Sequence, residues 1–162
     1  MKRSEIIFGL TKLIGDALGI MGCLLLAYIL RRENIDLLPF LQLLQQSTNL
    51  PSLREYIQSF LLPSTALYLC IAASLKLYVL RSTQGAWLEI GRVILTSLLW
   101  LTAILAWFSL IEVKLFFSRA LLLQATAMTM VIISLLHCCI IIVQRWCLKR
   151  GIGVRSVISI GS

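Results

Sequence analysis

The sequence predicts an all-α membrane protein folded as a four-transmembrane-helix bundle, and three observations carry this prediction. First, the 162 residues are 59% hydrophobic and 14% charged, with a mean hydropathy of +0.93, whereas soluble domains carry about 25% charged residues. Second, four apolar stretches approach the length of about 20 residues that a helix needs to cross the hydrocarbon core. Third, the 15 Lys and Arg residues flank these stretches, as orientation signals and headgroup contacts do. The basic balance therefore indicates a lipid bilayer as the partner, and no nucleic acid.

The four predicted spans follow one another along the chain with charged residues near their ends. Arg31 and Arg32 close the first span, which is too long for the apolar core of a cleaved signal peptide. The connections around the third span are short, so consecutive helices should be antiparallel neighbours. The predicted spans, within a transmembrane domain of residues 1–148, are 13–30, 60–80, 93–111 and 120–143.

The connection between the first and second spans is polar but keeps a helical pattern. Apolar residues repeat at helical spacing over 37–44 and again over 53–60, and Pro39 and Pro51 interrupt the connection. We therefore expect two short amphipathic, interfacial helices that lie against the membrane surface.

The distribution of basic residues predicts that both termini are cytoplasmic. Positively charged residues accumulate on the cytoplasmic side of a bilayer, and with the N-terminus inside, ten of the 15 Lys and Arg residues lie on that side. Arg31 and Arg32 oppose this orientation because they fall in the connection on the other side. The ten are Lys2, Arg3, Lys12, Lys76, Arg81, Arg92, Arg145, Lys149, Arg150 and Arg155.

The residues after the fourth span follow a different pattern. The segment 149–155 is basic and contains two glycines, and the β-branched segment 156–160 follows it and ends at Gly161. A buried strand that ends in glycine is how a nucleotide-binding α/β domain begins, and a single strand cannot satisfy its backbone groups alone. We therefore expect residues 149–162 to be the start of a truncated Rossmann-like cytosolic domain, and the chain to be the N-terminal part of a longer protein.

Asp16 is the only carboxylate inside a predicted span. Ionisable residues within membrane helices are candidates for function by default. Lys12 precedes Asp16 by one helical turn, where the two side chains can pair and the lysine can extend to the interface. The sequence favours such an intramembrane pair, with a proton- or ion-coupling role for Asp16 as the alternative.

Three glycines of the first span, Gly15, Gly19 and Gly22, lie on nearly the same helix face. Small residues at this spacing let a second helix approach closely. We predict that this face packs against another helix, which belongs either to the same chain or to a second copy.

His137 stands beside Cys138 and Cys139 in the fourth span, which raises the question of a soft metal site. Adjacent residues point to different faces of a helix, so a hydrogen bond from His137 across the bundle is the better interpretation. The chain also has no Ser/His/Asp set and no complete phosphate-binding glycine loop, although phosphoryl and glycosyl chemistry needs preorganised charge, a metal or a base. We therefore predict no catalytic, cofactor-binding or metal-binding residue in this chain.

Short fragments spread over the whole chain are each weak, but their order and spacing together are specific. The most specific is 144–146, followed by the basic glycine segment and the strand to Gly161. The others are 2–5, 16–18, Leu77-Tyr78, 81–83, Glu89 and Ser118-Arg119. In these fragments the chain resembles the N-terminal membrane region of the bacterial polyprenyl glycosylphosphotransferases, the large type of bacterial sugar transferase. His137 is a departure, since it stands about where relatives often place an arginine.

This resemblance implies a four-helix membrane bundle in the bacterial inner membrane, then a cytosolic Rossmann-like domain, then a catalytic domain. The catalytic domain would use Mg2+ and an acidic pair to transfer a hexose-1-phosphate from a nucleotide sugar to undecaprenyl phosphate, which initiates exopolysaccharide, capsule or O-antigen synthesis. None of its motifs falls within residues 1–162, so the chain would anchor the enzyme and form a homodimer. Residues that would contact headgroups or undecaprenyl phosphate at the cytoplasmic face are Arg81, Arg92, Arg145, Lys149 and Arg150.

Two other classes of protein remain open at this point. A small four-helix membrane carrier, such as a lipid-linked sugar flippase or a cation exporter, would place a carboxylate near the middle of the membrane. Asp16 is shallower, about 5 Å below the interface at 1.5 Å per residue. A structural or assembly subunit would instead need a partner that exposes a matching small-residue face.

Overall fold

The computed structural model describes residues 3–33, 51–78, 86–110 and 119–150, and every regular element within them is helical. Four helical segments are long and apolar enough to cross a membrane, namely Gly9–Arg32, Leu53–Ser74, Trp87–Trp107 and Leu121–Gln144. For the described residues, the prediction of a helical protein with four helices of membrane-spanning length is therefore confirmed. The elements, in chain order, are α1 (Arg3–Arg32), α2 (Leu53–Tyr56), a π-helical turn (Ile57–Leu61), α3 (Leu62–Ser74), α4 (Ala86–Leu110) and α5 (Arg119–Lys149).

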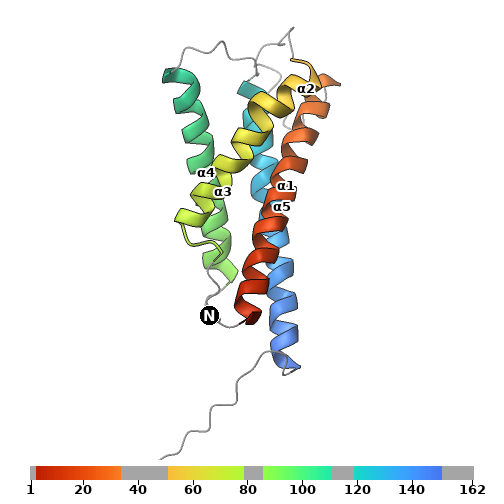
Figure 1. The fold of residues 1–162 in the computed structure, drawn as a ribbon, viewed down its shortest axis with the longest axis vertical. Coiled ribbons are helices and arrows are strands. Elements are labelled where there is room, and N and C mark those ends of the chain that lie inside the picture. Colours follow the sequence, from red (N-terminus) through yellow and green to blue (C-terminus); the bar gives the residue numbers. More distant parts are fainter. Residues whose placement is uncertain (1–2, 34–50, 79–85, 111–118, 151–162) are drawn as a thin grey trace, which may run out of the picture.

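The helices run alternately up and down, so that α1 begins and α5 ends at the same end of the bundle (Figure 1). This end is termed the terminal end below. The main contacts join α1 to α5, α5 to α4, α4 to α3 and α3 to α1. These contacts close a ring of four helices, in which short side chains and ridges at four-residue spacing allow close packing.

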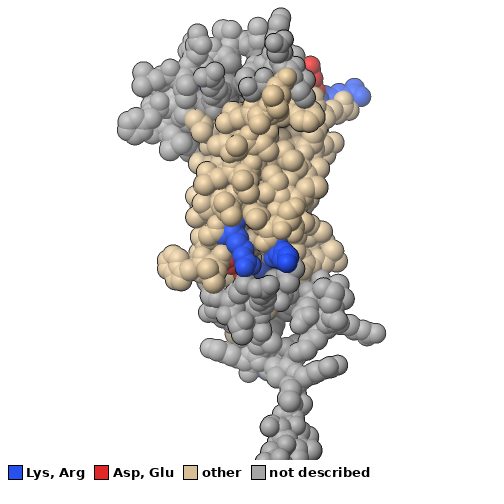
Figure 2. All heavy atoms as spheres, turned by 90° about the vertical axis from the view of Figure 1, so that its left-hand side faces the viewer, with Lys and Arg blue, Asp and Glu red and all other residues tan. Residues whose placement is uncertain are grey.

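The outer surface of the bundle is apolar, as expected for a protein whose solvent is lipid. On α1, for example, Leu10, Ile14 and Leu18 are exposed at a spacing of four residues. Figure 2 shows a continuous surface without Lys, Arg, Asp or Glu between charged side chains near the two ends of the described region. Such a surface would be unstable in water, since soluble monomers rarely expose large apolar patches. A lipid bilayer is therefore its natural environment.

The second span begins earlier than the sequence predicted, because 53–60 is continuous with it. The prediction of a separate interfacial helix at 53–60 is thus wrong. Tyr56 explains the difference: it is fully buried, its hydroxyl donates a hydrogen bond to the Leu24 carbonyl at 3.0 Å, and its ring stacks on Tyr28 with centroids 4.6 Å apart. These contacts hold the start of the segment against α1 inside the bundle. The predicted interfacial helix at 37–44 and the strand at 156–160 lie outside the described residues.

The second span also ends earlier than predicted, at Ser74 instead of residue 80. Lys76 adopts a left-handed backbone with φ of 55°, and the amides of Lys76 and Leu77 donate to the carbonyls of Ala73 and Ala72 at 3.0 Å. This pattern is a Schellman motif, which closes a helix and redirects the chain. Hydropathy does not mark the end because apolar residues continue beyond it.

Pro63 lies in the first turn of α3, directly after the π-helical turn. A proline within a continuous helix lacks an amide hydrogen and crowds the carbonyl four residues earlier. The wider π-helical turn before it accommodates that crowding. The segment Leu53–Ser74 can therefore cross the membrane as one unit despite the proline.

Polar side chains inside the bundle are mostly satisfied within their own helices or by a neighbour. Thr65, Thr96 and Thr129 each donate to the carbonyl four residues earlier, at 2.7 or 2.8 Å. The indole nitrogen of the fully buried Trp100 donates to the Ser64 carbonyl at 3.0 Å, which joins α4 to α3. The middle of the bundle is thus a packed core.

Candidate functional site: a buried ionisable cluster

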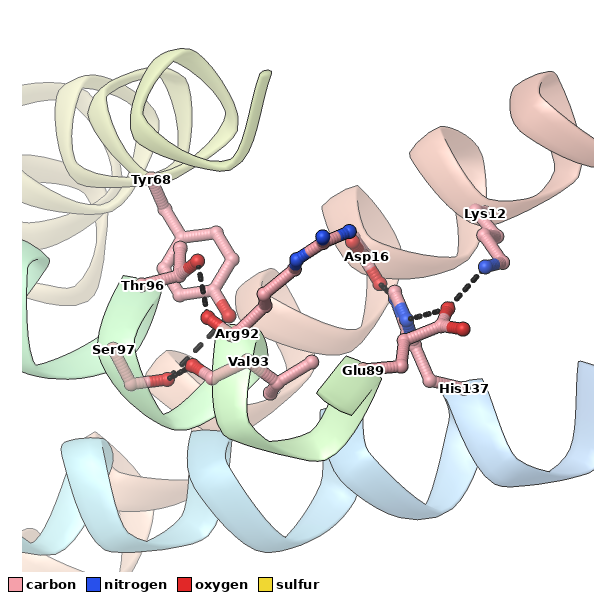
Figure 3. A network of polar contacts seen from close by, with 9 residues as sticks. All are labelled: Lys12, Asp16, Tyr68, Glu89, Arg92, Val93, Thr96, Ser97 and His137. Carbon is pink, nitrogen blue, oxygen red and sulfur yellow. Dashed lines mark hydrogen bonds and ion pairs between the residues drawn. The ribbon is translucent and has the colours of Figure 1, made fainter. Parts of the chain in front are cut away.

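Four ionisable side chains from three helices meet inside the bundle towards the terminal end. Figure 3 shows Lys12 and Asp16 on α1, Glu89 on α4 and His137 on α5 pointing towards one another. This ionisable cluster is buried: Lys12 is 2% exposed, Asp16 and His137 are 0% exposed, and the Glu89 side chain is 14% exposed. It is the most unusual feature of the described residues, since charged groups inside a membrane protein are rare and costly.

On α1 and α5, the residues of the cluster lie on helix faces whose buried positions repeat every four residues. On α1, Lys12 and Asp16 share the buried face with Ile20 and Leu24, each four residues apart. On α5, His137 belongs to a buried ridge at the same spacing, which carries the apolar or small residues 121, 125, 133 and 141. Since α1 and α5 pack against each other, the two ridges bring Asp16 and His137 together. Glu89 enters from the first turn of α4.

His137 is the centre of the cluster. Its Nε2 lies 2.9 Å from Asp16 Oδ1, and its Nδ1 lies 3.0 Å from Glu89 Oε1. Lys12 donates to the same Glu89 oxygen through its Nζ. These contacts join α1, α4 and α5 at one point. The prediction that His137 is hydrogen-bonded across the bundle is confirmed.

The predicted pairing of Lys12 with Asp16 differs from the contacts found. Lys12 binds Glu89, and Asp16 binds His137. The physical reason is that both side chains point into the bundle, where α4 and α5 supply their partners. Lys12 therefore does not extend towards the headgroups. Glu89 was missed as a member of the site because a glutamate at the start of a span resembles an ordinary boundary charge.

Two further oxygens are buried beside the cluster, namely Asp16 Oδ2 and the Tyr78 hydroxyl. Tyr78 follows the end of α3. Its backbone carbonyl oxygen lies close to α1, since a Cβ added to Gly9 would be 3.2 Å from this oxygen. Burial first, and then the nearby Asp16 carboxylate, raise the pKa of the Tyr78 hydroxyl well above its usual value. Tyr78 therefore stays neutral beside Asp16.

The predicted packing role of the first-span glycines applies to two of the three. A Cβ on Gly15 would lie 3.1 Å from a Leu136 methyl carbon, and one on Gly19 would lie 2.7 Å from the Ile133 Cδ1 atom. Both glycines therefore let α1 approach α5 within the same chain. Gly22 would meet nothing within 4 Å, so it does not belong to this contact.

The basic residues predicted to meet lipid headgroups are only partly visible. Arg92 is half-buried on α4, one turn after Glu89. The exposed Arg150 places its guanidinium 3.6 Å from the centre of the Trp146 ring, a cation–π contact. Arg145 and Lys149 lie in the last turns of α5, and Arg81 lies outside the described residues. Figure 2 shows basic side chains near the lower edge of the apolar surface, towards the terminal end.

In the part of the chain that the structure describes, no group of three or more His, Cys, Asp and Glu side chains is arranged to hold a metal ion. Comparison of the chain with known protein families, with curated proteins and with solved structures gives no match. The resemblance to polyprenyl glycosylphosphotransferases therefore depends on the sequence fragments alone.

Proposed function

We propose that this chain is the membrane-anchoring domain of a polyprenyl glycosylphosphotransferase in the bacterial inner membrane, with both termini in the cytosol. In this role it holds the enzyme where a hexose-1-phosphate is moved from a nucleotide sugar to undecaprenyl phosphate. The sequence fragments described above support the assignment. The chain also forms a homodimer in this proposal, and Gly22, which has no neighbour within 4 Å of its missing side chain, is open to a second copy.

One structural observation carries the proposal furthest. An even number of spans returns α5 to the end where α1 begins, and the most specific fragment, 144–146, lies near that end of α5. An anchor of this form keeps the residues before and after the bundle on one side of the membrane. The basic side chains at that end suit the negative surface potential of a bacterial cytoplasmic leaflet.

The proposal predicts loss of a defined lipid product. Membranes from a strain in which the gene for this chain is deleted should no longer transfer radiolabelled hexose-1-phosphate from UDP-hexoses to endogenous undecaprenyl phosphate. The readout is label in the organic extract, and a plasmid carrying the intact gene should restore it. Unchanged organic-soluble label in the deletion strain, with each UDP-hexose tested, would reject the proposal.

The headgroup contact can be tested at Arg150 separately. Replacing Arg150 by glutamine should weaken retention of phosphatidylglycerol by about fivefold, since one basic residue near an anionic surface contributes on the order of 1 kcal/mol. Lipid retention by the purified protein in mixed micelles can be measured by native mass spectrometry. Arg54→Gln is the matched control, because Arg54 is exposed at the opposite end of the bundle. Equal effects of the two substitutions would contradict a specific role of the terminal end.

A small membrane carrier is the second candidate, and the buried ionisable cluster is the observation that favours it. A carrier needs polar groups that continue towards the opposite face of the membrane. Beyond His137, the buried ridge of α5 continues with Ile133, Thr129 and Ala125, and Thr129 donates its hydroxyl to its own helix. The ridge offers no further ionisable group among its described residues, so the anchoring function is the better supported.

A further inference from the structure

The single histidine of the chain has a carboxylate oxygen at hydrogen-bond distance from each of its ring nitrogens. A neutral imidazole has one N–H donor, and its other nitrogen is an acceptor. Asp16 Oδ1 at 2.9 Å and Glu89 Oε1 at 3.0 Å are also acceptors when ionised. With a neutral imidazole and two carboxylates, one of the two contacts would therefore bring lone pair against lone pair. Both contacts become hydrogen bonds when the imidazole carries two protons.

We propose that the ionisable cluster is a proton-binding site, in which His137 is held as an imidazolium ion at neutral pH and joins α1, α4 and α5. The ligand of this site is a single proton. The inference does not depend on the transferase function proposed above.

The contacts around His137 agree with this assignment. Its Nε2 lies 2.9 Å from Asp16 Oδ1 and its Nδ1 lies 3.0 Å from Glu89 Oε1. An imidazolium between two carboxylates makes two charge-assisted hydrogen bonds, which are stronger than bonds between neutral groups. The assignment therefore depends on this hydrogen-bond geometry.

Other ionisable groups lie around the site. Tyr68 and Tyr78 interact electrostatically with Asp16 from the α3 side, and tyrosines are neutral at pH 7 because their ordinary pKa is about 10. Arg92 is half-buried and lies one turn after Glu89 on α4, with its side chain drawn beside Asp16 in Figure 3. The ionisable groups in and around the cluster, by element, are Lys12 and Asp16 of α1, Tyr68 of α3, Tyr78 after α3, and Glu89 and Arg92 of α4.

Loss of the proton has a structural consequence. One ring nitrogen of His137 would then face a carboxylate without a hydrogen between them, and either the α1 or the α4 contact would become repulsive. The proton therefore lets His137 of α5 form hydrogen bonds to both α1 and α4 at the terminal end. The contact should weaken as the pH rises through the value at which the cluster releases its proton.

Because the chain has one histidine, nitrogen-15 labelling of histidine reports on this site alone. The purified protein in lipid should show two protonated ring nitrogens by solid-state NMR at about pH 7.5, where an exposed imidazole with a pKa of about 6.5 is roughly nine-tenths neutral. A spectrum with one protonated and one unprotonated ring nitrogen at that pH would overturn the proposal.

Two variants sharpen this measurement. Asp16→Asn removes one carboxylate partner, so His137 should release its proton at a lower pH than in the wild-type protein. Glu55→Gln is the matched control, since it removes an exposed carboxylate of α2 outside the cluster, and it should leave the titration unchanged. An unshifted titration in Asp16→Asn would overturn the assignment. If that variant does not fold, the wild-type spectrum decides the question.

Discussion

Replacing His137 by leucine should lower the free energy of unfolding by about 3–5 kcal/mol, because it leaves the fully buried Asp16 without its partner. Glu89 keeps Lys12 in this variant, so the loss arises mainly at Asp16. The measurement is reversible unfolding of the protein in detergent micelles, followed by far-ultraviolet circular dichroism. A loss below about 1 kcal/mol would show that the buried pair is not held as described.

Two further variants separate the effect of charge from that of lost packing. His137→Arg keeps a positive charge between the carboxylates, so it should retain more stability than His137→Leu. The double variant Asp16→Leu/His137→Leu removes both members of the pair, and it should recover most of the loss because the Asp16 carboxylate is removed together with its imidazole partner. Equal instability of the single and double leucine variants would attribute the effect to packing at position 137.

The helical architecture could be predicted because hydropathy and length alone determine whether a segment can cross a bilayer. The ends of the second span could not be predicted in this way. At its start, Tyr56 is buried and its hydroxyl donates a hydrogen bond to the Leu24 carbonyl of another helix. A contact between helices of this kind cannot be recognised in the local sequence. At its end, Lys76 adopts a left-handed conformation. A glycine at this position would have predicted the end of the helix, but a lysine does not.

The sequence identified three of the four residues of the cluster but did not predict which of them would contact one another. Asp16 and His137 could be singled out because ionisable residues in spans are rare, but they are 121 residues apart in sequence, and their contact depends on how α1 packs on α5. Glu89 could have been found from the same packing, since alternating helix directions make α1 and α4 begin at the same end of the bundle, which puts the first turn of α4 near the depth of Asp16. The four-residue spacing of apolar and small residues along α1 and α5 could have indicated that Asp16 and His137 lie on the faces that pack together.

The close packing of α1 on α5 can be tested at Gly19. Replacing Gly19 by leucine should destabilise the bundle by about 1–3 kcal/mol, since overpacking of a well-packed contact forces neighbours to move. A Cβ alone would lie 2.7 Å from the end of the Ile133 side chain, which can rotate away, whereas a full leucine side chain must separate the two helices. That separation would also lengthen the contact between Asp16 and His137, one turn along each helix.

Gly22→Leu is the matched control for this substitution. Both glycines lie in α1 and both changes add the same side chain, but a Cβ on Gly22 would meet nothing within 4 Å. In micelles that keep the protein monomeric, Gly22→Leu should therefore leave the unfolding midpoint close to that of the wild-type protein, and the added helix propensity of leucine favours it slightly. Equal destabilisation by the two substitutions would mean that α1 does not approach α5 through Gly19. Destabilisation by Gly22→Leu alone would mean that the close helix contact is made at Gly22, where a second copy of the chain could pack.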